Sequence, residues 1–167
     1  MLRRNFLKWS AFLSLSSFLK AENFTKMEVR FKKVEQTILE VQQQMFPYGS
    51  KLPSAKEMKT TTFLFDTMMH SSFDRDIRSF IIRGAEKLEE REKGKFTTYS
   101  IAQKEKAMRS FESTRYGRNW LGRMMTMAME AMFSDPIYGS NINEAGWKAL
   151  NSFGGFPRPK TRYLENV

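Results

Sequence analysis

A stripe of apolar residues at helical spacing constrains this chain more than any other feature. Between residues 25 and 46, large apolar side chains recur every three or four positions, with charged and amide side chains between them. The members of the stripe are Met27, Phe31, Val34, Ile38, Val41 and Met45. This spacing places them on one face of an α-helix. We therefore expect a helix from about Thr25 to Phe46 whose apolar face packs into a core.

Four further segments have helical patterns, at about residues 55–70, 72–94, 100–113 and 117–133. Ser100 with Gln103 makes a capping box at the start of one of them. Gly84 inside another costs up to about 1 kcal/mol relative to alanine, which indicates close packing there. No segment alternates apolar and polar residues as a strand does. A chain of 167 residues suffices for one core, so we expect a single all-α domain, a helical bundle, over residues 22–167.

An irregular segment, residues 133–157, follows the last expected helix. Pro136 lacks a backbone N–H and disfavours helical geometry at Asp135, while Gly139 and Asn141 tolerate positive φ. Large apolar groups stand among these turn residues, namely Phe133, Ile137, Tyr138 and Trp147. We therefore expect a non-helical, ordered loop that aromatic side chains pin against the bundle, followed by an irregular tail.

The same segment resembles the C-terminal signature of the gluconate 2-dehydrogenase subunit 3 family, small non-flavin subunits of periplasmic, FAD-dependent sugar or sugar-acid dehydrogenases. The pattern is Phe-x-Asp-Pro-x-Tyr-Gly-x-Asn, then Gly-Trp-Lys, then Gly-Phe-Pro. The matching residues are Asp135, Pro136, Tyr138, Gly139, Asn141, Gly146, Trp147, Lys148, Gly155, Phe156 and Pro157. The chain departs from the pattern at Ser140, where the family usually repeats glycine, and at residues 151–154, which look inserted.

The resemblance implies a complex in which a large partner subunit carries FAD and oxidises gluconate or a related polyol. Electrons would pass to quinone or to a third, haem-carrying cytochrome c subunit. The small subunit would help the flavoprotein mature and lend it an export signal, and the complex would associate with the inner membrane.

We expect the signature loop to contact the flavoprotein. Tyr138 and Trp147 would anchor the contact, because both bury a large area at low entropic cost. In the alternative, Trp147 packs inward and holds the loop on the bundle. The expected interface comprises Asp135, Pro136, Tyr138, Gly139, Asn141, Gly146, Trp147, Lys148, Phe156 and Pro157.

Residues 1–21 have the pattern of a leader read by the twin-arginine translocase, which carries folded proteins. An apolar run over residues 9–19 is about half of the ~20 residues that a membrane-spanning helix needs. Its serines leave no clean amphipathic face, which argues against an ordinary N-terminal helix. Leu19 in place of a small residue leaves cleavage open. The residues of the export signal are Arg3, Arg4, Phe6, Leu7 and Lys8.

The sequence has no pattern typical of catalysis or cofactor binding. It contains no cysteine, which excludes disulfides, iron–sulfur ligation and covalent haem attachment through Cys-x-x-Cys-His. His70 is the only histidine, and with Asp74 four residues on it makes a poor metal site. Gly-x-Gly-x-x-Gly and Walker loops are absent. We expect no catalytic, metal or cofactor-binding residue in this chain, with FAD held by the partner.

Five methionines wrap around the last expected helix and have two interpretations, a flexible core filler or half of a subunit interface. The resemblance favours the second. These residues are Met124, Met125, Met127, Met129 and Met132.

Three functional hypotheses follow. The leading one is a non-catalytic small subunit of a periplasmic flavin-dependent dehydrogenase. The second is a free-standing periplasmic binding or structural protein of helical fold, which the lack of a flavoprotein gene beside this one would favour. The third is a cytoplasmic nucleic-acid-binding protein. It would account for the net charge of +10 but not for the leader, and the scattered basic residues fit a solvated surface better.

Overall fold

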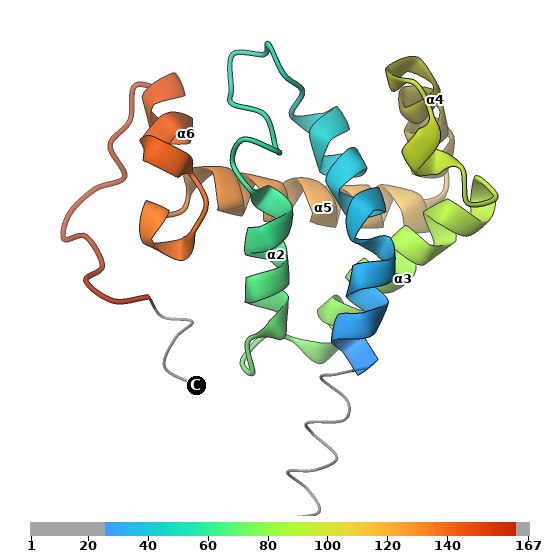
Figure 1. Ribbon diagram of the computed structural model, residues 1–167, viewed down its shortest axis with the longest axis horizontal. Coiled ribbons are helices and arrows are strands. Elements are labelled where there is room, and N and C mark those ends of the chain that lie inside the picture. The colour runs from blue at the N-terminus through green and yellow to red at the C-terminus, as the bar shows by residue number, and fades with distance from the viewer. Residues whose placement is uncertain (1–25, 163–167) are drawn as a thin grey trace, which may run out of the picture. The chain divides into compact units, whose positions relative to one another are not determined.

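A computed structural model describes residues 26–162, and within that range every regular element is a helix (Figure 1). The chain divides into two units, residues 1–33 and 34–167. In the first unit the described residues, 26–33, are helical, and helical residues 34–45 open the second. The further helices are α2 (Thr60–Met69), α3 (Arg75–Arg91), α4 (Ile101–Glu112), α5 (Arg115–Phe133) and α6 (Ala145–Ala149). Short 3-10 helices are η1 (Phe96–Thr98), η2 (Pro136–Tyr138) and η3 (Ile142–Glu144).

The expected all-α fold is confirmed, and most of the expected helix ends lie within three residues of those observed. Ser100 and Gln103 form the expected capping box at the start of α4. The largest difference is at α2, which begins at Thr60 rather than near residue 55. Residues 55–59 form a separate turn that ends at Lys59, whose φ of 53° is left-handed and breaks the helical path.

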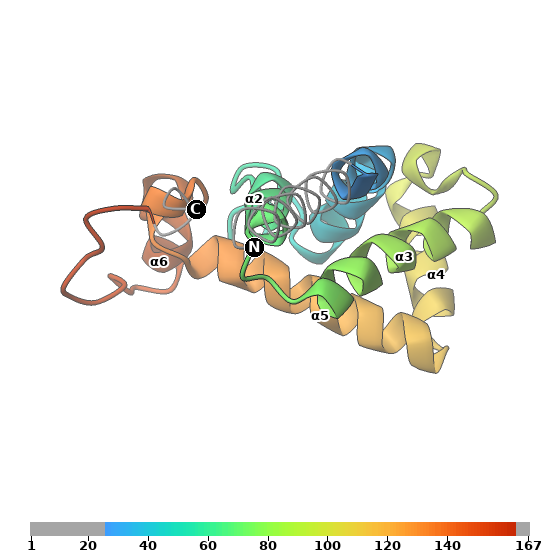
Figure 2. The same ribbon diagram turned by 90° about the horizontal axis from the view of Figure 1, so that it is seen from below.

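Helix α5 is the element on which the second unit is assembled, because it contacts α2, α3, α4 and α6 (Figure 2). Its buried side chains include Trp120, Leu121, Met124, Met127, Ala128, Ala131 and Met132. Met125 and Met129 lie on its exposed face. The five methionines therefore fall into two groups. Met124, Met127 and Met132 fill the core, while an interface role of Met125 and Met129 stays a prediction.

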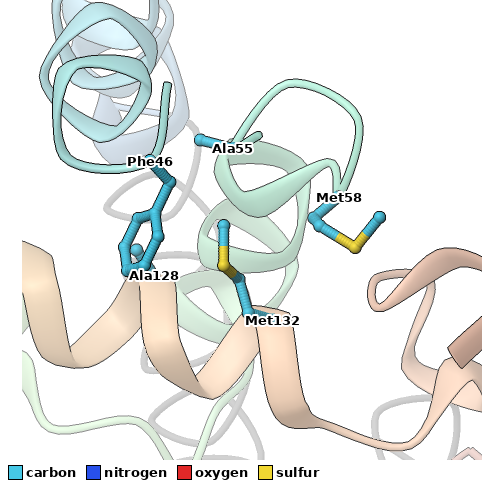
Figure 3. Packing of buried hydrophobic residues seen from close by; sticks show 5 residues of the cluster. All are labelled: Phe46, Ala55, Met58, Ala128 and Met132. Atoms are coloured by element: carbon cyan, nitrogen blue, oxygen red, sulfur yellow. The ribbon is translucent and has the colours of Figure 1, made fainter. Parts of the chain in front are cut away.

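An apolar cluster lies beside the C-terminal half of α5, where Phe46 packs near Ala128 and Met132 (Figure 3). Ala55 and Met58 complete its buried part. The partly buried side chains of Phe133, Ile142 and Ala145 pack against the same cluster. The loop after α5 is thereby attached to the core of the unit.

The crossing of α3 and α5 depends on a glycine under a tryptophan. Trp120 is fully buried, and its indole Nε1 donates a hydrogen bond to the Ile81 carbonyl at 2.9 Å. A Cβ atom on Gly84 would lie 2.0 Å from Cδ1 of that indole. The close packing expected at Gly84 is confirmed. Among the described helices none has the length and hydropathy needed to cross a membrane.

Replacing Gly84 by alanine tests this crossing. We expect Gly84→Ala to lower the free energy of unfolding by about 1–3 kcal/mol, because the added methyl group must displace a buried indole. Gly122→Ala is the matched control, since Gly122 is an exposed glycine of α5 and a methyl group added to it would meet no atom within 4 Å. That control should gain up to about 1 kcal/mol from helix propensity. Urea unfolding measures both, and equal stabilisation of the two variants would contradict the packing described.

Candidate functional site

The candidate site is the signature loop, residues 133–157, which closes the C-terminal end of α5. The last carbonyl groups of a helix have no partner within the helix. Side chains of the loop reach back to them. Ser140 Oγ donates to the Ala131 carbonyl at 2.8 Å, and Trp147 Nε1 donates to the Phe133 carbonyl at 2.8 Å. The loop is therefore the C-terminal cap of the central helix.

Asn141 joins the start and the end of this cap. It is fully buried and has a left-handed φ of 47°, which asparagine tolerates well. Its Nδ2 donates to the Ser134 carbonyl at 2.9 Å, and its Oδ1 accepts from the Gly146 N–H at 2.9 Å. A Cβ on Gly146 would lie 2.1 Å from the Met132 carbonyl oxygen, so α6 can approach α5 here only with glycine.

The expectation that this segment contains no helix is wrong, because three short helical pieces build it. Asp135 caps the first, η2, by accepting from the Ile137 N–H at 3.0 Å. Pro136 stands at the first position of η2, where a missing N–H costs nothing. Gly139 then ends η2 with a φ of 84°. The turn-forming residues thus limit each helix to a turn or so instead of preventing helices, and α6 carries Trp147.

Arg158 folds the tail back onto the loop through four contacts. Its guanidinium lies 3.0 Å from Asp135 Oδ2 and 2.6 Å from Glu144 Oε1. It also stands 4.4 Å from the centre of the Trp147 ring and donates to the Phe153 carbonyl at 3.2 Å. Arginine suits this role because its planar group can bind two carboxylates and stack on an indole at once. The network joins both ends of the loop.

Arg162 makes a second connection, from the tail to helix α2. Its Nη2 donates to Asp66 Oδ2 at 2.7 Å and to the Tyr138 carbonyl at 3.2 Å. The tail is therefore held at two points, by Arg158 on the loop and by Arg162 on α2 and the Tyr138 carbonyl.

Trp147 lies inward in this structure. Trp147 is 6% exposed and lies between Arg158 and Gly154. A Cβ atom added to Gly154 would lie 2.3 Å from the Trp147 ring. This is the alternative arrangement, in which the tryptophan holds the loop on the helices. Asn141 and Gly146 are also buried, and Asp135, Pro136 and Tyr138 are partly so. Exposed members of the expected interface are Gly139, Lys148, Phe156 and Pro157. A direct partner contact by any of them stays a prediction.

Sequence reasoning missed several residues on which this geometry depends. Ser140 is a departure from the family pattern, yet its hydroxyl caps α5. Arg158 and Arg162 were not singled out, yet Arg158 pairs with Asp135 and Glu144, and Arg162 pairs with Asp66. No local pattern pairs charges so far apart along the chain, so only the fold brings them together.

The described residues offer little for metal chemistry. In the range 26–162 no three His, Cys, Asp or Glu side chains gather where they could hold a metal ion. His70 Nδ1 lies 2.7 Å from Ser72 Oγ, a local contact at the end of α2. A shallow groove of about 520 Å³ runs beside the loop, lined by Leu52, Pro53, Met58, Ile142, Ala145 and Ala149 among others.

A family model described as gluconate 2-dehydrogenase subunit 3 matches residues 32–155. The matched range covers well over half of the chain and includes helices α2 to α6 and nearly all of the signature loop. Comparison with curated proteins and with solved structures gave no match.

Two variants test the inward role of Trp147. We expect Trp147→Ala to lower the free energy of unfolding by about 3–5 kcal/mol, because a buried ring is lost and the Phe133 carbonyl loses its donor. Phe153→Ala is the control: Phe153 is 68% exposed, so its loss should change stability by at most about 0.5 kcal/mol. Chemical unfolding of the isolated chain gives both values. A Trp147→Ala variant as stable as the control would show that the indole does not hold the loop.

Proposed function

This chain belongs to the gluconate 2-dehydrogenase subunit 3 family, and we propose that it is the non-catalytic small subunit of a periplasmic, FAD-dependent complex that oxidises gluconate or a related compound. The observation that carries this proposal is the family match over residues 32–155. The family is one of small subunits of dehydrogenase complexes, so partner dehydrogenase subunits are implied. The large partner would hold FAD, and a cytochrome c subunit with haem would be a third.

A supporting role suits the way in which the signature residues are used. The polar atoms of Asn141 and the indole N–H of Trp147 bind the end of α5 and the start of α6. Asp135 is engaged by the backbone of η2 and by Arg158. The polar atoms of these residues are used in bonds within the chain. They fix the conformation of the loop and are not available for chemistry on a substrate.

We further propose that this loop contacts the flavoprotein. Asp135, Pro136, Asn141, Gly146 and Trp147 would set its shape. Exposed or partly exposed residues of the loop and tail would make the contact, namely Tyr138, Gly139, Lys148, Phe156 and Pro157.

Export is the second half of the proposed role. The signal residues Arg3, Arg4, Phe6, Leu7 and Lys8 lie outside the described residues, so their function stays a prediction from sequence. Because the twin-arginine pathway carries folded proteins, one leader can export a folded complex. This chain would then help its partner mature and take it to the periplasmic side of the inner membrane.

Changing both arginines to lysine tests the export role. The Arg3→Lys/Arg4→Lys variant keeps the charge but removes the pair that the translocase reads, so the chain and any partner without a leader should remain in the cytoplasm. Lys20→Arg, another charge-conserving change in the leader, should be exported normally. Cell fractionation with immunoblotting measures both, and normal periplasmic delivery of the double variant would refute twin-arginine dependence.

Purification of the chain alone and with its partner tests the proposed division of labour. The isolated chain should show no flavin absorbance and should reduce no dye with gluconate. A tagged chain recovered from the periplasm should bring an FAD-containing dehydrogenase subunit with it. A yellow, flavin-loaded single chain with dye-reducing activity would overturn the non-catalytic role.

A further inference from the structure

We propose that an exposed apolar surface at the C-terminal end of the signature loop, formed by Leu150, Phe153, Phe156 and Pro157, is where this chain docks its dehydrogenase subunit. The inference rests on the proposed function and specifies its contact. We call these four residues the tail surface. They lie just after α6, in the segment drawn in red in Figure 1. Leu150 and Phe153 were not among the residues expected from the signature.

The tail surface concentrates large apolar groups that are open to solvent. Phe156 is 84% exposed, Phe153 68% and Leu150 50%. The two phenyl rings have centroids 6.1 Å apart and are tilted by 33°, so they form one continuous patch. Scattered apolar residues are ordinary on a protein surface, whereas neighbouring exposed aromatics typically mark an interaction site. Aromatic rings are also the commonest anchors of protein interfaces.

The contacts below the surface fix it in place. Arg158 donates to the Phe153 carbonyl and is itself bound to Asp135 and Glu144. Gly154, between the two phenylalanines, lies against the ring of Trp147. The backbone at Phe153 and Gly154 is therefore held in place before any partner arrives. Such preorganisation raises affinity, because little conformational entropy remains to be lost on binding.

The charges around the tail surface indicate the chemistry of the partner. Residues 145–162 include four basic side chains, Lys148, Arg158, Lys160 and Arg162, and no acidic one. Both arginines bind carboxylates of this chain, whereas the two lysines are exposed. The complementary partner surface is an apolar pocket for the phenyl rings with carboxylates at its rim. Such a rim would speed association at low salt.

Two other occupants fit less well. A second copy of this chain, placed symmetrically on the same patch, would bring two pairs of lysines together. An anionic bilayer is usually recognised by clusters of about four to eight basic residues, whereas residues 145–162 contain two exposed lysines. Membership of the family already implies a dehydrogenase subunit as a partner. A surface of that subunit with an apolar pocket and carboxylates around it would match both the phenyl rings and the lysines.

The test is a double substitution in the full chain, co-expressed with the FAD-containing subunit that copurifies with the wild type. Phe153→Ser/Phe156→Ser should weaken binding at least thirtyfold in a titration of the purified subunits. Its melting temperature should match that of the wild type, because both rings are exposed. Ile101→Ser is the matched control, since Ile101 is 77% exposed on α4, away from the loop. That variant should bind like the wild type. If the double variant unfolds, the single Phe156→Ser change gives the same test, with an expected loss of at least fivefold.

The possible results separate the docking surface from the function on which it rests. If the wild-type chain captures no flavoprotein, the proposed function fails and the docking surface with it. If the wild type captures the flavoprotein and a folded double variant binds it equally well, the docking surface alone is refuted. Two further measurements complete the test. Analytical sedimentation of the chain alone measures self-association, and flotation with phosphatidylglycerol vesicles measures lipid binding. A double variant that loses self-association or vesicle binding but keeps its affinity for the flavoprotein would assign the surface to a second copy or to lipid.

Discussion

The structure of this chain depends on how the carbonyl groups at the C-terminal end of α5, which have no partner within the helix, are hydrogen-bonded. Helix α5 contacts four other helices, and Ala131 and Met132 at its C-terminal end are fully buried, so water does not replace the missing partners there. Carbonyls of Ala131, Phe133 and Ser134 instead receive hydrogen bonds from side chains of the following loop. Each such bond is worth only about 1 kcal/mol net, but a buried carbonyl left without a donor would cost about 1–3 kcal/mol. The loop is therefore part of the helix end that it closes.

A tryptophan that packs against a glycine and donates to a carbonyl group is found near each end of α5. Trp120 donates its indole N–H to the Ile81 carbonyl and lies on Gly84. Trp147 donates to the Phe133 carbonyl and lies against Gly154. In each case glycine lets the backbone approach the indole closely, while the ring's one donor satisfies a carbonyl group. The first pair joins α3 to α5, and the second joins the loop to the C-terminal end of α5. Neither indole N–H remains for a partner.

The sequence predicted the helices well and the loop only in part. Periodic apolar residues and local caps such as Ser100 depend on neighbours along the chain, so the all-α fold and most helix ends followed from pattern alone. The start of α2 was missed because Lys59 adopts a left-handed φ that no rule for lysine predicts. The loop was recognised as ordered, but its helical turns and the role of Arg158 were not. Bonds from Arg158 to Asp135 and Glu144 span 23 and 14 positions, beyond the reach of local patterns.

The residues that identify the family in this loop differ in exposure from those proposed to contact a partner. Asn141, Gly146 and Trp147 identify the signature, and all three are buried in the cap of α5. A change at these positions would lower stability, and it would alter the proposed binding only through the shape of the loop. Phe156 belongs to the same signature yet is almost fully open to solvent. A side chain this exposed buries little apolar area in the isolated chain beyond its contact with the Phe153 ring, which is why we propose that Phe156 is covered by a partner.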